Sequence, residues 1–184
     1  MSNETVPHRL DVRAFAQAGG SLQGSEALAQ FARIEQSGTG DGVPGLVQWS
    51  AHGEVRDDHA AEPQLWLHLQ ARAEVALTCQ RCLGPLKMPV LVDRWFRFVA
   101  DEATATAQDE VCEEDILVLV PDFNLHALIE DELLLELPYI PRHEACPVQG
   151  PMSVADPGIA EPEPRPNPFA ALAGLKSSGG KSSG

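Results

Sequence analysis

Four side chains in two short pairs have the types and the spacing that bind a metal ion. Cys79 and Cys82 are separated by two residues, and much later in the chain His143 and Cys146 repeat that spacing. Tetrahedral zinc takes four nitrogen or sulfur ligands, commonly as two such pairs, because a short spacing lets one turn aim two ligands at one ion. The sequence therefore offers a Cys3His site, with zinc as the possible cofactor.

Two other interpretations of Cys79 and Cys82 stay open. Two reduced thiols can simply shape a tight turn, and a Cys-x-x-Cys pair can also carry out redox chemistry through a thiol of strongly lowered pKa. Redox chemistry ranks last, because reactive pairs sit at a helix N-terminus and this pair sits between two strand-like runs. The zinc interpretation has a weakness too, since His143 and Cys146 lie in a proline-rich, loose segment without a turn signature. Cys112 lies alone among acidic residues.

The Cys-x-x-Cys pair lies where one alternating pattern stops and another begins. Apolar residues take every second position from Leu65 to Cys79, and a period of two returns over residues 87–100. Such alternation is typical of strands with one buried face. We therefore expect an antiparallel hairpin with residues 80–86 at its turn.

The remaining elements are predicted from their periodicity and their capping residues. Further strands are expected at residues 46–55 and 116–120, and helices at 12–18, at 26–36 after Ser25 as N-cap, and at 125–137 after Asn124 as N-cap. Together they predict an α+β domain, in which helices pack against an antiparallel meander sheet of about four strands.

Basic side chains lie on the polar face and at the turn of the predicted hairpin: Arg72, Arg81, Lys87, Arg94 and Arg97. With Trp66 and Trp95 among them, they could hold RNA by phosphate pairing and base stacking. The more ordinary alternative is that arginine side chains cover a strand face and pair with nearby acids. Arg81 differs from the rest, because a turn leaves it little core to cover and places it well to contact a partner.

The chain is acidic, and its charge is unevenly distributed. The formal net charge is −14, and residues 101–146 hold one basic and 13 acidic side chains. Because nucleic-acid binding depends on lysine and arginine, this charge argues against wrapping RNA or DNA around the whole surface. It favours a basic protein as partner for the acidic segment. Glu130, Asp131 and Glu132 are interpreted as a solvated face of the helix at 125–137, because adjacent helical residues point in different directions and no nucleophile accompanies them.

We expect one globular domain over residues 1–146 and a disordered, proline-rich tail over 147–184. Within this tail, residues 167–176 form a short amphipathic motif that would fold only by docking. Its candidate interaction residues are Asn167, Phe169, Leu172 and Lys176.

Two further patterns exclude other classes of protein. Residues 40–45 match the dinucleotide fingerprint G-x-G-x-x-G, but a helix is expected before them and a strand after them, which is the reverse of the order that fingerprint needs. We interpret them as a flexible loop. Residues 1–11 lack the basic start and the apolar stretch of a secretory signal, and no apolar run has membrane-spanning length. We therefore expect a cytoplasmic protein with reduced thiols and no membrane partner.

Four segments in the same order resemble the bacterial YceD family, the large ribosomal RNA subunit accumulation proteins. They are residues 77–83 with the Cys-x-x-Cys pair, 129–138 with the acidic run, His143 with Cys146, and 166–176. The resemblance implies a cytoplasmic, non-enzymatic factor for the synthesis, processing or stability of the 23S ribosomal RNA. The expected partners are components of the large-subunit precursor, namely ribosomal RNA or basic ribosomal and assembly proteins, and not DNA.

The resemblance also assigns interaction or structural roles to particular residues: Cys79, Arg81, Cys82, Glu130, Glu132 and the motif at 167–176. Some relatives have a second Cys-x-x-Cys pair where this chain has His143 and Cys146, and that departure weakens the zinc interpretation. The competing hypothesis is a small structural zinc-binding module that acts as a protein-interaction adaptor.

Overall fold

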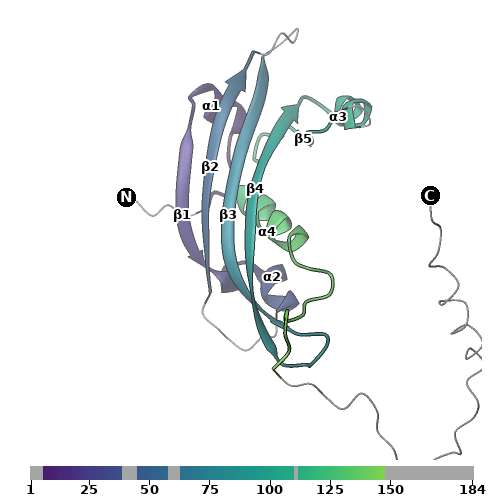
Figure 1. Cartoon of the computed structure of the whole chain (residues 1–184). Coiled ribbons are helices and arrows are strands. Elements are labelled where there is room, and N and C mark those ends of the chain that lie inside the picture. Colours follow the sequence, from purple (N-terminus) through teal and green to yellow (C-terminus); the bar gives the residue numbers. More distant parts are fainter. Residues whose placement is uncertain (1–5, 39–44, 58–62, 110–111, 148–184) are drawn as a thin grey trace, which may run out of the picture. The chain divides into compact units, whose positions relative to one another are not determined.

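Long, bent strands form the body of the molecule, and the helices at residues 12–17, 32–37 and 125–135 pack against one side of them (Figure 1). The computed structural model describes residues 6–38, 45–57, 63–109 and 112–147. Five strands form one sheet in the order β1-β2-β3-β4-β5. Their bounds are Ser21–Ala27 (β1), Leu46–Arg56 (β2), Gln64–Thr78 (β3), Pro85–Val99 (β4) and Asp115–Val118 (β5).

The β3–β4 hairpin is the centre of the sheet and confirms the prediction made from its alternating pattern. Each strand has 15 residues, and the antiparallel register runs from Leu65 opposite Phe98 to Thr78 opposite Pro85. Every odd-numbered residue of β3 is buried, because alternate side chains of a strand point to the same face. The hairpin therefore ends in a turn at residues 79–84, which holds the Cys-x-x-Cys pair.

The prediction of a purely antiparallel meander was wrong at the last strand. β5 pairs with β4 in parallel, from Phe96 opposite Asp115 to Val99 opposite Val118. A parallel neighbour needs a crossover connection, and here the chain passes through helix α3 (Glu102–Asp109) before it returns. The result is a mixed sheet of five strands within the expected α+β class.

The predicted helix at 26–36 was also wrong over its first half. Ser25 is not an N-cap: it lies in β1, opposite Gln48 of β2. A 3-10 turn, η1 (Leu28–Gln30), follows β1, and helix α2 spans only Ala32–Ser37. The residues of this stretch favour helix locally, but backbone hydrogen bonds along the free edge of β2 outweigh that weak preference.

The other two predicted helices are confirmed, with somewhat different ends. Asp11 caps α1 (Val12–Gln17), and Gly19 ends it in the left-handed region at φ +59°. Asn124 caps α4 (Leu125–Leu135) by accepting a 3.1 Å hydrogen bond from the Ala127 N–H. The core buries apolar side chains of these helices against the sheet: Val12, Ala16, Leu125, Leu128, Ile129 and Leu133.

Among the described residues, no helix is long and apolar enough to cross a membrane. Residues 39–44, which hold most of the glycine-rich pattern, and residues 148–184, which hold the motif at 167–176, lie outside the described part of the chain. The predictions for the tail and for the boundary of the globular domain therefore stay predictions.

Candidate metal centre

The turn of the β3–β4 hairpin brings Cys79 and Cys82 to one side of a tight loop. The Cys79 N–H donates to the Gly84 oxygen at 2.9 Å, and the Leu83 N–H donates to the Cys79 oxygen at 2.9 Å. Leu83 lies in the left-handed region at φ +57°, a conformation that costs free energy for a residue with a β-carbon. This unfavourable conformation lies directly after Cys82, in the turn that brings the two cysteines together.

The segment after α4 returns to this turn and brings the second pair with it. The Gln80 N–H donates to the Pro141 oxygen at 2.8 Å, which joins the two segments through their backbones. His143 Nε2 lies 3.1 Å from the Pro85 oxygen. The proline-rich segment is therefore held at the hairpin tip by specific contacts, although the sequence indicated a loose one.

The four ligand atoms lie at separations that suit one tetrahedral ion. Cys79 Sγ is 3.8 Å from Cys146 Sγ, Cys82 Sγ is 3.5 Å from His143 Nδ1, and all four atoms lie within 4.8 Å of one another. With zinc–ligand bonds of about 2.3 Å to sulfur and 2.05 Å to nitrogen, a regular tetrahedron separates two sulfurs by about 3.8 Å and a sulfur from a nitrogen by about 3.6 Å. The cluster could thus hold a metal ion such as zinc.

The contact of His143 with Pro85 also decides which ring nitrogen faces the cluster. A carbonyl oxygen only accepts, so Nε2 carries the hydrogen that it donates to Pro85. In the neutral ring, Nδ1 then keeps its lone pair and points toward Cys82. Metal-binding histidines usually have such a partner behind the ring, which fixes the tautomer and the orientation.

Two of the thiols have pKa values shifted in opposite directions. For Cys79, burial raises the pKa, but backbone N–H groups of Cys82, His143 and Arg81 that donate to its sulfur lower it more, to about 5. For Cys146, burial and the neighbouring sulfurs raise the pKa to about 11. The site therefore stabilises one thiolate and opposes the next, and a bound cation would supply the charge that lets the others ionise.

The low pKa of Cys79 is also what a redox site would need, but its burial argues against that role. The residue is 0% exposed, whereas a reactive cysteine must be accessible to its partner. All four cysteines are free thiols, and the 3.8 Å between Cys79 and Cys146 far exceeds the disulfide bond length of about 2.05 Å.

Most of the basic side chains expected on the polar face have partners within the protein. Lys87 pairs with Glu74 at 3.2 Å. Arg97 is 7% exposed, and its guanidinium donates to Gln108 at 2.7 Å and to the sulfur of Cys112 at 3.3 Å. These residues follow the more ordinary interpretation of the basic pattern, in which arginine side chains satisfy nearby groups.

Arg94 was assigned to the wrong face of β4. It has the same parity as Val92 and Phe96, so its side chain points toward α4. There it pairs with Glu132 Oε2 at 3.2 Å and with Glu136 at 3.1 Å, and at the sheet edge it pairs with Asp115 at 3.4 Å. Arg81 is exposed at the turn, as the sequence predicted.

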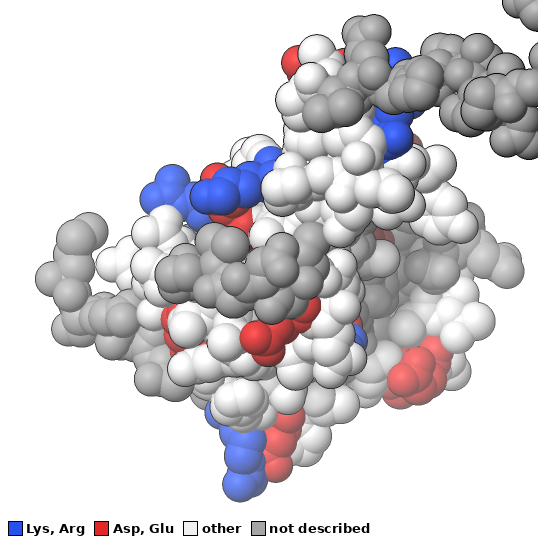
Figure 2. Space-filling model, turned by 90° about the horizontal axis from the view of Figure 1, so that it is seen from below, with Lys and Arg blue, Asp and Glu red and all other residues white. Residues whose placement is uncertain are grey.

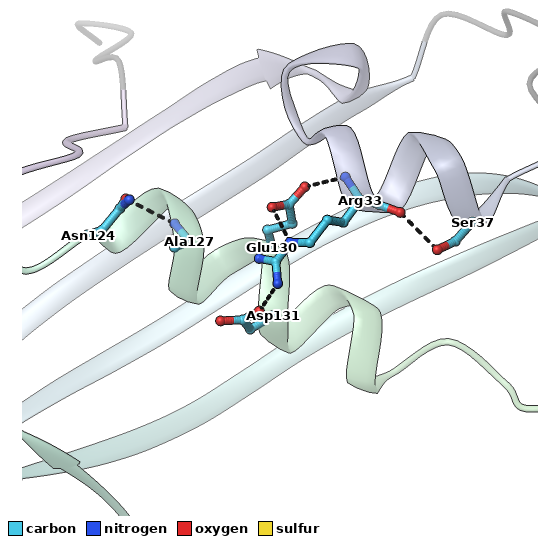
Figure 3. Close-up of polar contacts among 6 residues, drawn as sticks. All are labelled: Arg33, Ser37, Asn124, Ala127, Glu130 and Asp131. Carbon is cyan, nitrogen blue, oxygen red and sulfur yellow. Dashed lines mark hydrogen bonds and ion pairs between the residues drawn. The ribbon is translucent and has the colours of Figure 1, made fainter.

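The prediction of a solvated face for the acidic run on α4 was wrong for Glu130 and Glu132, which are 7% and 6% exposed, whereas Asp131 between them is exposed. Figure 3 shows Glu130 reaching toward α2, where its two oxygens accept from the backbone N–H and from Nε of Arg33, each at 2.8 Å. Burial raises the pKa of Glu130, but the hydrogen bonds from Arg33 lower it by more, so the pKa lies below its ordinary value. Burial also raises the pKa of Glu132, and there Arg94 does not compensate. The two acids fasten α4 to α2 and to β4.

Aromatic side chains form a cluster on the face of the sheet opposite α4. The Arg56 guanidinium lies 4.2 Å from the ring of Trp66 and 4.1 Å from that of Trp95, and His68 stacks on Trp95 at 4.2 Å. Next to this cluster is an open depression of about 750 Å³, whose lining includes Gln23, Ser25, Gln48, Ser50, Gln70 and Arg72. Trp66 is buried and Trp95 is half-buried, with Arg56 and His68 on its ring, so the two tryptophans offer little surface for stacking on RNA bases.

Sequence reasoning missed two exposed residues near the four metal-ligand candidates, Tyr139 and Arg142. Tyr139 is 99% exposed, and Arg142 is exposed immediately before the His143 ligand. An aromatic and an arginine between Pro138 and the second ligand pair were the available signal.

Fold and site together define an α+β sheet protein with a four-ligand cluster at the tip of its longest hairpin. The family model of the large ribosomal RNA subunit accumulation protein YceD matches residues 67–176, more than half of the chain. The chain therefore belongs to the YceD family, as its four segments indicated.

A relative named large ribosomal RNA subunit accumulation protein YceD, from Haemophilus influenzae, is 28% identical over 180 residues. The aligned region covers 96% of this chain and 99% of the relative. No solved structure is significantly similar.

Proposed function

We propose that this protein is a non-enzymatic ribosome biogenesis factor that supports the synthesis, processing or stability of the 23S ribosomal RNA. Membership of the YceD family carries the proposal, because the matched residues 67–176 include the central hairpin, the ligand cluster and α4. The name of the relative from Haemophilus influenzae refers to the same RNA. A cytoplasmic location follows from this role.

The charge of the chain supports a division of labour between its segments. The acidic segment and the motif at 167–176 would hold basic ribosomal or assembly proteins, while RNA is contacted locally at the hairpin. Arg81 is the predicted basic residue that stays available for such a contact, because Lys87, Arg94 and Arg97 have partners within the protein.

Deleting the gene and measuring the RNA of both subunits tests this function. We expect less 23S RNA relative to 16S RNA and fewer mature large subunits in sedimentation profiles, with recovery when the gene is restored. Unchanged RNA and particle profiles in the deletion strain would remove the basis of the proposal.

A second role is favoured by the geometry of the cluster: Cys79, Cys82, His143 and Cys146 bind one structural zinc ion. The sulfur–sulfur and sulfur–nitrogen separations of 3.8 and 3.5 Å carry this proposal. The ion would join the hairpin tip to the segment after α4, and it would leave no ligand position for a substrate. Protein purified without chelator should contain one zinc per chain, and a Cys82→Ser variant should contain much less.

A further inference from the structure

Seven of the ten lysine and arginine side chains in the described part of the chain have a partner within the protein. Ion pairs or hydrogen bonds hold Arg9, Arg33, Arg56, Arg72, Lys87, Arg94 and Arg97. Arg13, Arg81 and Arg142 make neither an ion pair nor a side-chain hydrogen bond to any described residue, and all three are exposed. Two of these three, Arg81 and Arg142, lie at the hairpin tip.

Exposed apolar side chains gather at the same end of the molecule. Leu83 is 75% exposed, Tyr139 is 99% exposed and Ile140 is 59% exposed. The backbone hydrogen bond from Gln80 to Pro141 places the turn that carries Leu83 beside the segment that carries Tyr139 and Ile140. We call the exposed group Arg81, Leu83, Tyr139, Ile140 and Arg142 the tip surface.

We propose that the tip surface binds single-stranded RNA, with Arg81 and Arg142 on phosphates and the Tyr139 ring stacked on a base. This inference rests on the proposed function in ribosomal RNA accumulation and assigns it a contact site. Recognition of unpaired RNA commonly uses an exposed aromatic ring together with arginine. Leu83 and Ile140 offer apolar surface on which a neighbouring base can lie.

The charge of the chain favours a short contact with single-stranded RNA over a long contact with a duplex. With a net charge of −14, the chain repels an extended polyanion, so a short contact at one end suits it better than a long one. Figure 2 views the molecule from the end where the hairpin turn lies in Figure 1, and its charged side chains form separate groups on a mostly uncharged surface. Such a surface suits stacking on unpaired bases more than tracking a duplex backbone.

Glu144 is the exposed acid within the same segment, and it limits the strength of the contact. Its carboxylate opposes a phosphate held by Arg142 two residues earlier. Glu144→Gln should therefore tighten RNA binding, whereas replacing either arginine should weaken it.

Fluorescence anisotropy with the full chain tests the proposal directly. The probe is a labelled single-stranded RNA of about a dozen nucleotides, within the range that such sites accommodate. The same strand in a duplex and an acidic peptide of equal charge are the competitors. We expect Tyr139→Ala to weaken binding about tenfold, as loss of one stacked base does. Two phosphate contacts predict a slope of log affinity against log salt of about −1.4. Replacing either arginine should make this slope shallower, about −0.7.

Arg13→Ala is the matched control, because Arg13 is an equally free arginine on α1. Thermal melting of each variant shows whether it folds, and Tyr139→Phe keeps the stacking ring and should bind normally. Equal losses in Arg13→Ala and Arg81→Ala, tighter binding of the acidic peptide, or no binding of single-stranded RNA would each overturn the proposal.

The outcome separates this inference from the function on which it rests. If the deletion strain loses 23S RNA and Tyr139→Ala restores it fully, the protein acts in ribosomal RNA accumulation but not through the tip surface. If the deletion changes nothing while Tyr139→Ala still weakens RNA binding, the contact exists and the proposed function fails.

Discussion

We expect a strong zinc chelator to free residues 138–147 from the hairpin tip while the sheet and α4 stay folded. Besides the four cluster residues, two hydrogen bonds join this segment to the tip, one from Gln80 to Pro141 and one from His143 to Pro85. No residue of the segment belongs to the buried core. The change should therefore be local.

The magnitude follows from these contacts. At about 1 kcal/mol each, the two hydrogen bonds contribute about 2 kcal/mol. Fixing the backbone of about ten residues costs about 10–20 kcal/mol, so the bonds alone cannot hold the segment. A structural zinc ion contributes about 10–16 kcal/mol, which is enough to offset that cost.

Hydrogen exchange measured with and without chelator gives the readout. Peptides covering residues 79–85 and 138–147 should lose protection, while those from β2, β3 and α4 keep it and the far-ultraviolet circular dichroism stays constant. Thiol titration should show three additional reactive groups, since Cys79, Cys82 and Cys146 share the site. Cys112→Ser is the control, because Cys112 lies outside the cluster and the variant should keep its zinc.

Two results would refute this reasoning. Protein that carries no zinc and still protects residues 138–147 would show that protein contacts suffice. Complete unfolding on chelation would show that the ion supports the core and not only the tip.

The remaining predictions concern the core of the fold. Glu130→Gln should destabilise the protein by about 1–3 kcal/mol in denaturant unfolding, because it removes the buried negative charge that pairs with Arg33. Asp122→Asn, in the exposed pair with Arg9, should change the stability little. The lowered pKa of Glu130 means that its stabilisation is present above the ordinary pKa of a glutamate and is lost as the pH falls through the lowered value. The raised pKa of Glu132 has the opposite sign: stability declines as the pH rises from the ordinary value through the raised one, and Glu132→Gln should remove that decline in melting curves. Gly53→Ala should cost about 1–3 kcal/mol, because the added carbon would lie 2.6 Å from Phe15 Cδ1 and 2.9 Å from Ala16 Cα; an unchanged melting temperature would contradict the packing of α1 on β2.

The parts of the fold that sequence predicted well are those where local pattern and burial agree. β3 and β4 alternate without interruption, and Asn124 caps α4 where the apolar stripe begins. The stretch around Ser25 was assigned incorrectly, because a strand at a sheet edge depends on hydrogen bonds to β2 that no local pattern reveals.

The site was predictable in its ligand types but not in its geometry. Spacing suggested that His143 and Cys146 could join Cys79 and Cys82, yet their approach depends on how the chain leaves α4 and on the bond from Gln80 to Pro141. The partners of Glu130 lie far away in sequence, on α2, so its burial could not be read from the acidic run.

The position of the ligands along the chain has a consequence for the time course of folding. Cys82 and His143 are separated by 61 positions, and β4, α3, β5 and α4 all lie between them. During synthesis from the N-terminus, the first two ligands emerge well before the last two, and the loop between them closes only when α4 has docked. Binding of a metal ion by the four residues would therefore be a late event, and a chain that holds such an ion would already have completed the sheet.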